Sequence, residues 1–446
     1  MKIPKSPPDW RQILAEANPE GLSRFFRLST ESAATDRYHH WDKLRFYKPP
    51  AGLTREEWWA ALKLRRASQY QSVGLIDKKG KPFVFLVPNF AHKTLHRIDQ
   101  HAGGELLMSD LPTEETRSHR IVSSLIEEAI TSSQLEGAAV TREVAKKMLR
   151  TGRDPVSKDE RMILNNYLTM RELERLKDEP LSEGLVFEIH RMITQHTLKE
   201  ESQAGRFRTN QEQFDIGNDF YDEVYHVPPL ADELPERLYR MCEFANSGTS
   251  VSWIHPVVRS IVLHFWLAYD HPFIDGNGRT ARALFYWSML RHGYWLVEFV
   301  TISRILNRSP GRYYKAFLHT ETDDNDLTYF IVHQLDVLQT AIDELREYLR
   351  RKQHEMVDGG SLIKRLLSVN LRQRNLLAHA LRHPHAEYSF AIHRDYHGIS
   401  QQTSRTDLQS LADLGLLVRS KVGREFVYSP VENLIDKIKE FEDNGI

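Results

Sequence analysis

Twelve consecutive residues, from His271 to Arg282, contain several groups that could act on phosphate. The run Gly276-Asn277-Gly278 predicts a tight turn that opens a helix over residues 279–290, and the N–H groups of such a turn form an anion site. Arg279 and Arg282 are three residues apart and therefore share one helix face. Their guanidinium groups have the planar donor geometry that suits phosphate. The stretch therefore predicts a phosphate-binding site.

Two further residues of this stretch could supply chemistry. Asp275 directly precedes the turn and could hold a divalent metal ion that bridges phosphates. His271 is a candidate general base, because an imidazole changes its protonation state near neutral pH. The apolar residues 260–269 predict a helix that ends near His271, since Pro272 has no N–H to donate and restricts the residue before it. Base, metal ligand and phosphate site together predict a phosphate-transfer reaction.

The stretch resembles the Fic signature H-x-F-x-[DE]-G-N-G-R-x-x-R and matches it at every fixed position. The resemblance implies a mainly α fold, a Fic-type helical bundle with a β-hairpin flap. It also implies transfer of AMP from ATP, with Mg²⁺, to a Ser, Thr or Tyr hydroxyl of a target protein and to the protein itself. By the same resemblance His271 is the catalytic base and Asp275 the metal ligand. The implied nucleotide-binding residues are Gly276, Asn277, Gly278, Arg279 and Arg282.

A second, shorter resemblance lies upstream. Residues 122–129 predict a helix that leads into Ser132, Glu136 and Gly137, and glycine is a natural helix end. These three residues occupy the fixed positions of the family's inhibitory sequence [ST]-x-x-x-E-[GN]. The resemblance implies that Glu136 pairs with Arg282 and blocks productive seating of ATP. We therefore expect an autoinhibited adenylyltransferase.

Two other functions stay open at this point. The same site could run backwards as a de-AMPylase, with Glu136 activating water to remove AMP. Alternatively, the chain could be a DNA-binding regulator whose Fic fold only senses nucleotide. The complete motif argues against a pure sensor, which has no need of His271. Kinase-like relatives carry lysine at the second glycine position, where this chain has Gly278.

The rest of the chain predicts the elements that position these residues. Apolar positions recur at helical spacing over 159–177 and 185–196, which indicates scaffold helices. The segment 205–229 breaks this pattern, and Gly217-Asn218-Asp219 predicts a hairpin turn. This segment resembles the family's flap, which lies over the active site and aligns the target segment by strand pairing.

Three regions are expected along the sequence: an N-terminal α/β region over 1–115, a Fic domain with its inhibitory helix over 116–357, and a winged-helix domain over 361–446. In the first, Thr54 and Glu57 predict a capping box, and residues 73–76 and 83–87 predict a hairpin. Asp358-Gly359-Gly360 predicts a linker. Residues 361–430 carry ten Lys/Arg and five Asp/Glu, a net charge of +5, so this domain could bind DNA or dock a protein.

Composition limits the remaining possibilities. The chain has 446 residues, a net charge of -1 and 41% hydrophobic residues, as expected of an ordinary globular protein. Its one cysteine, Cys242, excludes an internal disulfide and a cysteine-rich metal site. The sequence contains neither a signal-type N-terminus nor a run of about 20 apolar residues, so we expect a cytoplasmic protein without a membrane partner. An injected effector with a non-cleaved signal stays an alternative, and homodimerisation stays open.

Overall fold

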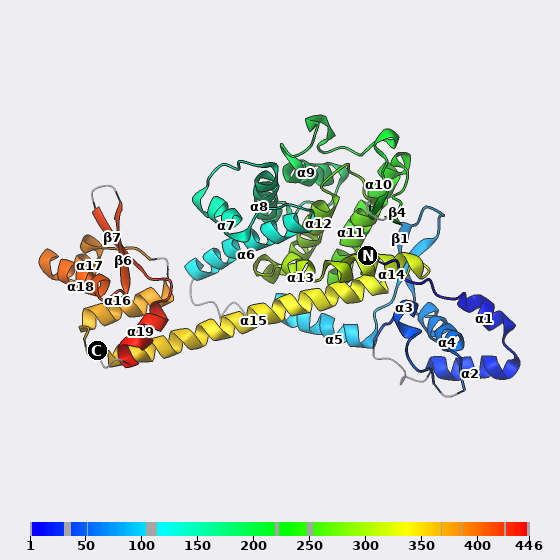
Figure 1. Ribbon diagram of the computed structural model, residues 1–446, viewed down its shortest axis with the longest axis horizontal. Helices are drawn as coiled ribbons and strands as arrows, with labels where there is room; N and C mark the ends of the chain where they lie inside the picture. The colour runs from blue at the N-terminus through cyan, green and yellow to red at the C-terminus, as the bar shows by residue number, and fades with distance from the viewer. Residues whose placement is uncertain are drawn as a thin grey trace. The chain divides into compact units, whose positions relative to one another are not determined.

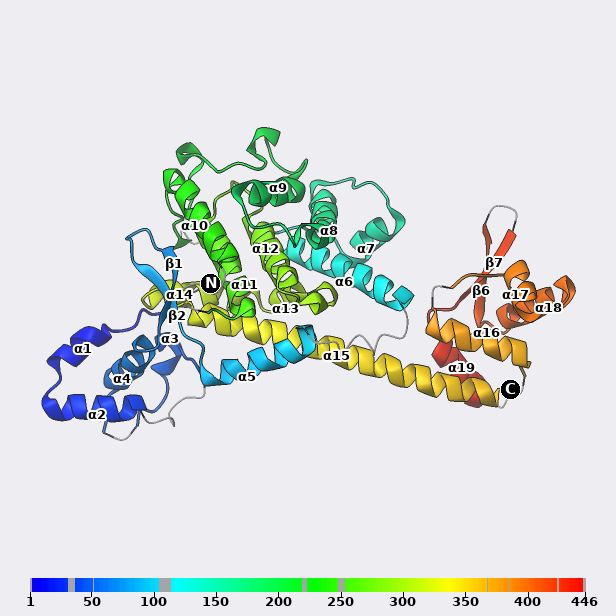
Figure 2. The same cartoon turned by 180° about the vertical axis from the view of Figure 1, so that it is seen from behind.

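The computed structural model describes residues 2–30, 37–50, 52–103, 114–218, 223–247, 253–366, 368–384, 386–422 and 425–443. Its contacts divide the chain into two compact units, one of residues 1–104 and 122–342 and the other of residues 105–121 and 343–446. Helices dominate both units, and the few strands form small sheets (Figures 1 and 2). The predicted, mainly α fold class is therefore confirmed. Within the described residues, no helix is long and apolar enough to cross a membrane.

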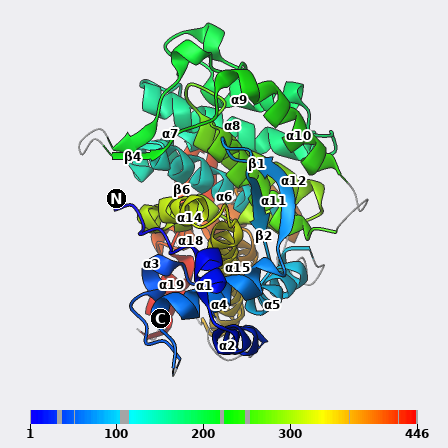
Figure 3. The ribbon, with the colours of Figure 1, turned by 90° about the vertical axis from the view of Figure 1, so that its right-hand side faces the viewer.

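The N-terminal part of the first unit is the expected mixture of helices and one hairpin. Its elements are α1 (Trp10–Glu16), α2 (Pro19–Thr30), α3 (Trp41–Leu44), α4 (Arg55–Ala67), β1 (Gln71–Ile76), β2 (Pro82–Phe85) and α5 (Asn89–Ile98). Thr54 and Glu57 form the predicted capping box of α4. Strands β1 and β2 pair antiparallel, and β1 packs beside helix α10 (Figure 3).

The larger part of the first unit is a bundle of helices. It contains the part of α6 (Glu114–Leu135) from residue 122 on, and α7 (Arg142–Thr151), α8 (Lys158–Leu176), α9 (Glu183–Thr194), α10 (Leu234–Asn246), α11 (Pro256–Asp270), α12 (Asn277–Arg291), α13 (Ile302–Arg308) and α14 (Pro310–Thr322). Helices α11 and α12 pack against each other and are buried almost all round, which explains their apolar sequences. The loop between them, residues 271–276, carries the predicted site.

The predicted flap is a short hairpin. Strand β3 (Ile216–Asn218) pairs antiparallel with β4 (Glu223–His226). Asp219, at the predicted turn, lies outside the described residues.

One boundary predicted from the sequence is wrong. Residues 358–360 were expected to form a linker, but helix α15 (Thr328–Arg365) continues through them. A glycine inside a helix costs roughly 0.5–1 kcal/mol relative to alanine, and good helix formers on both sides offset that cost. Two adjacent glycines without a proline are therefore compatible with a continuous helix.

The second unit has the order of elements that the sequence predicts: helices and then a hairpin. These are α16 (Leu371–Arg382), β5 (Tyr388–Ser389), α17 (Phe390–His397), α18 (Gln401–Asp413), β6 (Leu417–Val422), β7 (Glu425–Pro430) and α19 (Leu434–Asp443). The strands form one sheet in the order β5-β7-β6. Leu377, Leu408 and Tyr428 lie in the core between the helices and this sheet. Gly423 and Arg424, at the predicted turn of the hairpin, lie outside the described residues.

Candidate active site

The loop between α11 and α12 begins and ends with a left-handed backbone. His271 caps α11 with φ 46° and ψ 55°, and its N–H donates to the carbonyl of Leu267 at 3.0 Å. Gly276 has φ 85°, and a Cβ added there would lie 2.7 Å from Cγ2 of Thr194. Glycine is therefore required at 276 both by conformation and by space. His271 has no such freedom, so its unusual backbone must be held by its surroundings.

Asn277 closes this loop with its side chain. Its Oδ1 accepts from the N–H of Phe273 at 2.9 Å, and its Nδ2 donates to the carbonyl of the same residue at 2.8 Å. The side chain is 3% exposed. Asn277 was predicted to bind nucleotide, and its amide is instead used inside the loop, which leaves its backbone N–H as the group that could meet a ligand.

His190 on α9 is a structural partner of the loop that sequence reasoning missed. Its Nδ1 accepts from the N–H of Gly205 at 2.9 Å, so Nε2 carries the proton and donates to the carbonyl of Asp275 at 2.9 Å. The ring stacks on Phe273, with centroids 3.7 Å apart and planes at 13°. Burial lowers the pKa of His190 to about 4. A neutral His190 thus holds the backbone of Asp275, the candidate metal ligand.

Arg208 is the second partner that the sequence analysis did not identify. Its Nε donates to the carbonyl of His271 at 2.9 Å, and its NH2 donates to the carbonyl of Pro229 at 2.6 Å. Its own N–H donates to the carbonyl of Pro272 at 2.9 Å. The side chain is 2% exposed. Arg208 therefore ties the segment that carries the flap to the backbone around the candidate base.

Asp275 lies where the sequence predicts, at the start of the phosphate-binding turn. Its Oδ1 accepts from the N–H of Gly276 at 2.6 Å and from NH2 of Arg279 at 3.3 Å, while Oδ2 lies 4.0 Å from Nζ of Lys158. Its side chain is 42% exposed. Mg²⁺ is usually held by one or two carboxylates together with substrate phosphates. A single half-exposed carboxylate beside an anion site fits that pattern, and no group of three or more potential ligands occurs among the described residues.

The two predicted arginines are both buried and point to different helices. Arg279 donates from NH1 to the carbonyl of Ile193 on α9 at 3.2 Å. Its Nε has no hydrogen-bond partner among the described residues. Burial lowers the pKa of Arg279. A buried guanidinium with an unused donor, next to the N-terminus of α12, is a site for an anion.

Arg282 points instead to the end of α6. Its Nε donates to Oγ of Ser132 at 2.8 Å and its NH2 to the carbonyl of Ser132 at 2.9 Å. The same NH2 lies 2.9 Å from Oε1 of Glu136, and the Arg282 side chain is 2% exposed. The pairing of Glu136 with Arg282, implied by the resemblance, is thus present in the structure. The two contacts of Arg282 with Ser132 were not predicted.

Glu136 also lies against the turn that is predicted to bind phosphate. Helix α6 ends at Leu135, and Gly137 has φ 92°, which turns the chain away after Glu136. A Cβ added to Gly278 would lie only 2.1 Å from Oε1 of Glu136. The carboxylate is therefore pressed against the backbone of Gly278, in the space where a phosphate bound to this turn would lie.

The helix that presents Glu136 is itself firmly held. Glu128 on α6 is buried and accepts from the N–H of Ser303 at 3.0 Å and from its hydroxyl. Burial raises the pKa of Glu128. One turn earlier, the hydroxyl of Ser124 donates to the carbonyl of Phe299 at 3.0 Å. Glu136 is thus presented by an anchored element.

His271 is in the protonation state that a base needs. Its Nδ1 lies 3.2 Å from the carbonyl of Ala268 and donates to it, so Nε2 keeps a lone pair. Burial is the main cause that lowers the pKa of His271 to about 4. The side chain is only partly buried by area. At neutral pH the imidazole is therefore uncharged and can accept a proton.

The burial of His190 predicts that the protein loses stability in mild acid. His190 has a folded-state pKa of about 4, below the ordinary value of 6.5, so the unfolded chain binds more protons between these two values. Its contribution to the free energy of unfolding should fall by about 2 kcal/mol between pH 7 and pH 5. His190→Gln, which keeps one donor and one acceptor, should show a smaller drop in urea-unfolding midpoint over that range. An equal drop in both proteins would contradict this assignment.

Comparison with known proteins agrees with this site. Residues 180–289, which include α9 to most of α12, match the Fic/DOC family. The protein adenylyltransferase Fic of Drosophila yakuba is 30% identical over 198 residues, which are 43% of this chain and 36% of that protein. The protein of the same name from Drosophila willistoni is 37% identical over 112 residues, 24% of this chain and 20% of that protein. The chain thus spans about a third or less of the length of these relatives.

A solved structure supports the fold. A Fic family protein from Desulfovibrio desulfuricans G20 superimposes with a TM-score of 0.50 at 18% identity, over 77% of this chain and 95% of that one. At 18% identity, this similarity supports the fold alone. Residues 180–289 thus match the Fic/DOC family, and the superposition agrees with the fold of a Fic family protein.

Proposed function

We propose that this protein is an adenylyltransferase that transfers AMP from ATP to a hydroxyl of a target protein and of itself. The observation that carries the proposal is a neutral His271, with a free Nε2 lone pair, held beside a glycine turn and two buried arginines. A base next to a phosphate site is the combination that transfer to a hydroxyl requires. The name of the Drosophila relatives supports the same activity.

The residues define a simple sequence of events. Nε2 of His271 takes the proton of the target hydroxyl, whose oxygen attacks the α-phosphorus of ATP. The bond from that phosphorus to the bridging oxygen breaks, and pyrophosphate leaves. The turn of Gly276, Asn277 and Gly278, with Arg279, cradles the α- and β-phosphates, and Arg282 binds the γ-phosphate. Mg²⁺ held by Asp275 would neutralise charge on these phosphates.

The proposal includes inhibition by Glu136. Its carboxylate holds Arg282 and lies against Gly278, so it competes with a phosphate for both. Hydrolysis of the AMP–protein bond by the same site, with Glu136 activating water, is the second candidate. It is favoured by the position of a carboxylate, 29% exposed, directly over the phosphate-binding turn.

Labelled ATP tests the activity. The protein incubated with ATP labelled at the α-phosphorus should acquire covalent label, whereas ATP labelled at the γ-phosphorus should leave none. Label from the γ position would indicate a kinase instead. Loss of AMP from a pre-labelled target, faster with wild type than with a Glu136 variant, would assign the reverse reaction.

For the C-terminal unit we propose a winged-helix domain that binds double-stranded DNA through residues 361–430. Helix α18 exposes Gln401, Gln402 and Arg405, side chains that can bond to base edges in the major groove. On strand β6, Arg419 and Lys421 are exposed and could contact phosphate. A cytoplasmic location stays a prediction from the sequence, and homodimerisation stays open.

Fluorescence anisotropy with a random-sequence duplex would test this binding. Arg405→Ala and Lys421→Ala should weaken it and reduce its dependence on salt. Lys437→Ala on α19, whose side chain pairs with Glu440, is the control and should change nothing. Absence of salt-dependent binding by the parent protein would favour a protein-docking role.

A further inference from the structure

The end of α11, Tyr269-Asp270-His271, is held by side chains that lead back to the N-terminal region. We propose that residues 1–103 are part of the active-site architecture, and that Arg237 and His226 are positioning residues that transmit their support to His271. The activity measurements that test this proposal depend on the proposed transfer reaction. The supporting contacts are buried and lie within the first compact unit.

The first line of contacts runs through Arg237 on α10. Its Nε and NH2 lie 2.8 and 2.7 Å from Oδ1 of Asp270, the residue directly before His271. NH2 also donates to the carbonyl of Ile76, at the end of strand β1, at 2.6 Å. Both charged side chains are 6% exposed. One guanidinium therefore joins the N-terminal hairpin to the last turn of α11.

The second line runs through the flap. His226 on β4 donates from Nε2 to the carbonyl of Tyr269 at 2.7 Å, and its Nδ1 lies 2.8 Å from Oε2 of Glu321 on α14. The ring therefore contacts one partner with each of its two nitrogens. Its side chain is 9% exposed. The end of α11 is thus fixed from a second direction by the last turn of α14.

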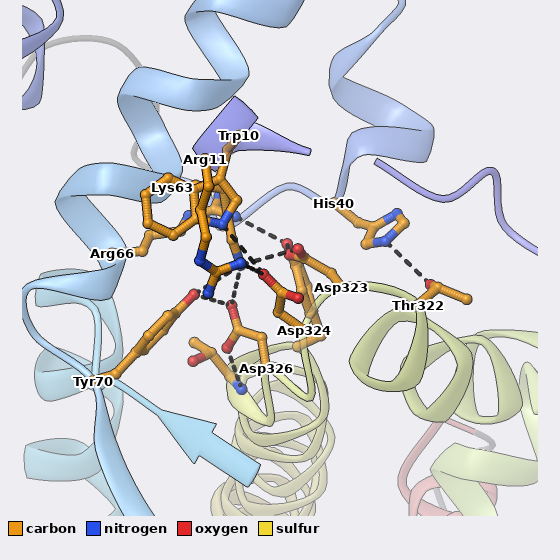
Figure 4. A network of polar contacts seen from close by, with 12 residues as sticks. Trp10, Arg11, His40, Lys63, Arg66, Tyr70, Thr322, Asp323, Asp324 and Asp326 are labelled. Carbon is orange, nitrogen blue, oxygen red and sulfur yellow. Dashed lines mark hydrogen bonds and ion pairs between the residues drawn. The ribbon is translucent and has the colours of Figure 1, made fainter. Parts of the chain in front are cut away.

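The loop that follows α14 is fastened to the N-terminal region by a buried ionic network (Figure 4). Nζ of Lys63 lies 2.9 Å from Oδ1 of Asp323 and 3.7 Å from Oδ2 of Asp326. The hydroxyls of Tyr38 and Tyr70 each donate to that Oδ2 at 2.6 Å. The Lys63, Asp323 and Asp326 side chains are at most 2% exposed.

Further contacts extend this network over the whole loop. Trp10 and Arg11 donate to Oδ2 of Asp324 at 3.2 and 3.1 Å. Asp324 has φ 59°, a left-handed backbone that aspartate adopts more readily than most residues with a side chain. Strand β2 completes the attachment, because the carbonyl of Val84 accepts from the N–H of Leu327 at 2.8 Å. The N-terminal region therefore determines the conformation of the α14–α15 loop.

The two sets of contacts end on Tyr269 and Asp270. These residues directly precede His271, which has a left-handed backbone. A buried ion pair adds little net stability over an apolar pair of similar volume, but it can specify one arrangement. Precise placement matters for a base, because a displacement of about 1 Å can cost about 10²-fold in rate. The arrangement thus predicts that loosening these contacts lowers kcat more than it raises KM for ATP.

The test compares two arginines of the same helix in full-length Glu136→Gly protein. Arg237→Met should lower kcat at least about tenfold with KM for ATP changed less than about twofold, and Arg237→Lys should recover part of it. Arg240→Met removes an exposed pair with Glu236, 44% and 63% exposed, and should leave both parameters unchanged. Glu321→Gln and Tyr70→Phe, nearly isosteric, should give smaller losses of kcat.

Hydrogen exchange gives a readout that needs no activity. The N–H of His271, which bonds to Leu267, should exchange at least about tenfold faster in Arg237→Met than in Arg240→Met. If the parent transfers no AMP, the proposed function fails and the exchange rates alone decide the present inference. Equal exchange, or a melting temperature lowered without a change in kcat, would overturn it.

Discussion

Replacing Glu136 with glycine is expected to raise AMP transfer about 10²-fold and to tighten ATP binding. Arg282 can bond to a carboxylate or to a γ-phosphate, and in the structure it bonds to Oε1 of Glu136 at 2.9 Å. The anchored helix α6 presents this carboxylate permanently, at high effective concentration. A γ-phosphate that cannot reach Arg282 also misplaces the α-phosphorus. Labelling from α-labelled ATP and calorimetric titration with ATP measure both effects.

Matched variants separate this mechanism from general loosening of α6. Glu136→Asp, one methylene shorter, should free Arg282 only partly and give an intermediate rate. Arg282→Ala in the Glu136→Gly background should lose the gain, because the anchor of the γ-phosphate is then missing. Glu136→Gly protein that is no more active than wild type, against itself or against a lysate, would refute the inhibitory role.

The structure adds a contact that the resemblance did not contain. The carboxylate of Glu136 lies so close to Gly278 that any Cβ at position 278 would overlap it. Inhibition by Glu136 would therefore act twice, by holding Arg282 and by filling the space above the turn. This explains why a single side chain, with no large lid, is sufficient for the proposed block.

The motif residues could be predicted because the chemistry of a phosphate site depends on residues close together in sequence. The glycine turn, Asp275 and the two arginines all fall within eight positions, and the inhibitory residues follow a recognisable spacing. The helices around them also follow from their periodicity. The linker at residues 358–360 was mispredicted because glycine weakens a helix without always ending it.

The supporting residues could not be predicted for a physical reason. His190 and Arg208 bond to the backbone carbonyls of Asp275 and His271, 85 and 63 residues away. A carbonyl is the same in every residue, so its partner leaves no pattern in the sequence. The only available signal was a polar side chain on an otherwise apolar helix face, as at His190. Such a signal does not reveal what the side chain contacts.

The same reasoning applies to the N-terminal region. Lys63 and Asp323 are 260 positions apart in the chain, and each would be expected at the surface if taken alone. Only the fold shows that they neutralise each other at 2.9 Å. Tyr38 and Tyr70 join the same network as hydroxyl donors to Asp326.

Removing the imidazole of position 271 is expected to lower transfer by about 10²–10⁴-fold while leaving ATP binding and the fold intact. His271 has φ 46°, so His271→Gly keeps the native backbone without strain, whereas His271→Ala does not. If proton transfer is the role of this residue, both variants should be equally inactive although the alanine variant is less stable. Single-turnover labelling, ATP titration and thermal unfolding measure the three quantities.

The pH dependence of the Glu136→Gly protein provides the control. With a pKa of about 4, His271 is neutral and competent at all pH values well above 4. The charge of Glu136 raises that pKa, so loss of this charge alone lowers the value further. The rate should therefore stay level between pH 8 and pH 6, where a histidine of ordinary pKa would already lose activity. A rate that falls with a midpoint near 6.5, or a His271→Gly variant within tenfold of its parent, would exclude a buried neutral imidazole as the base.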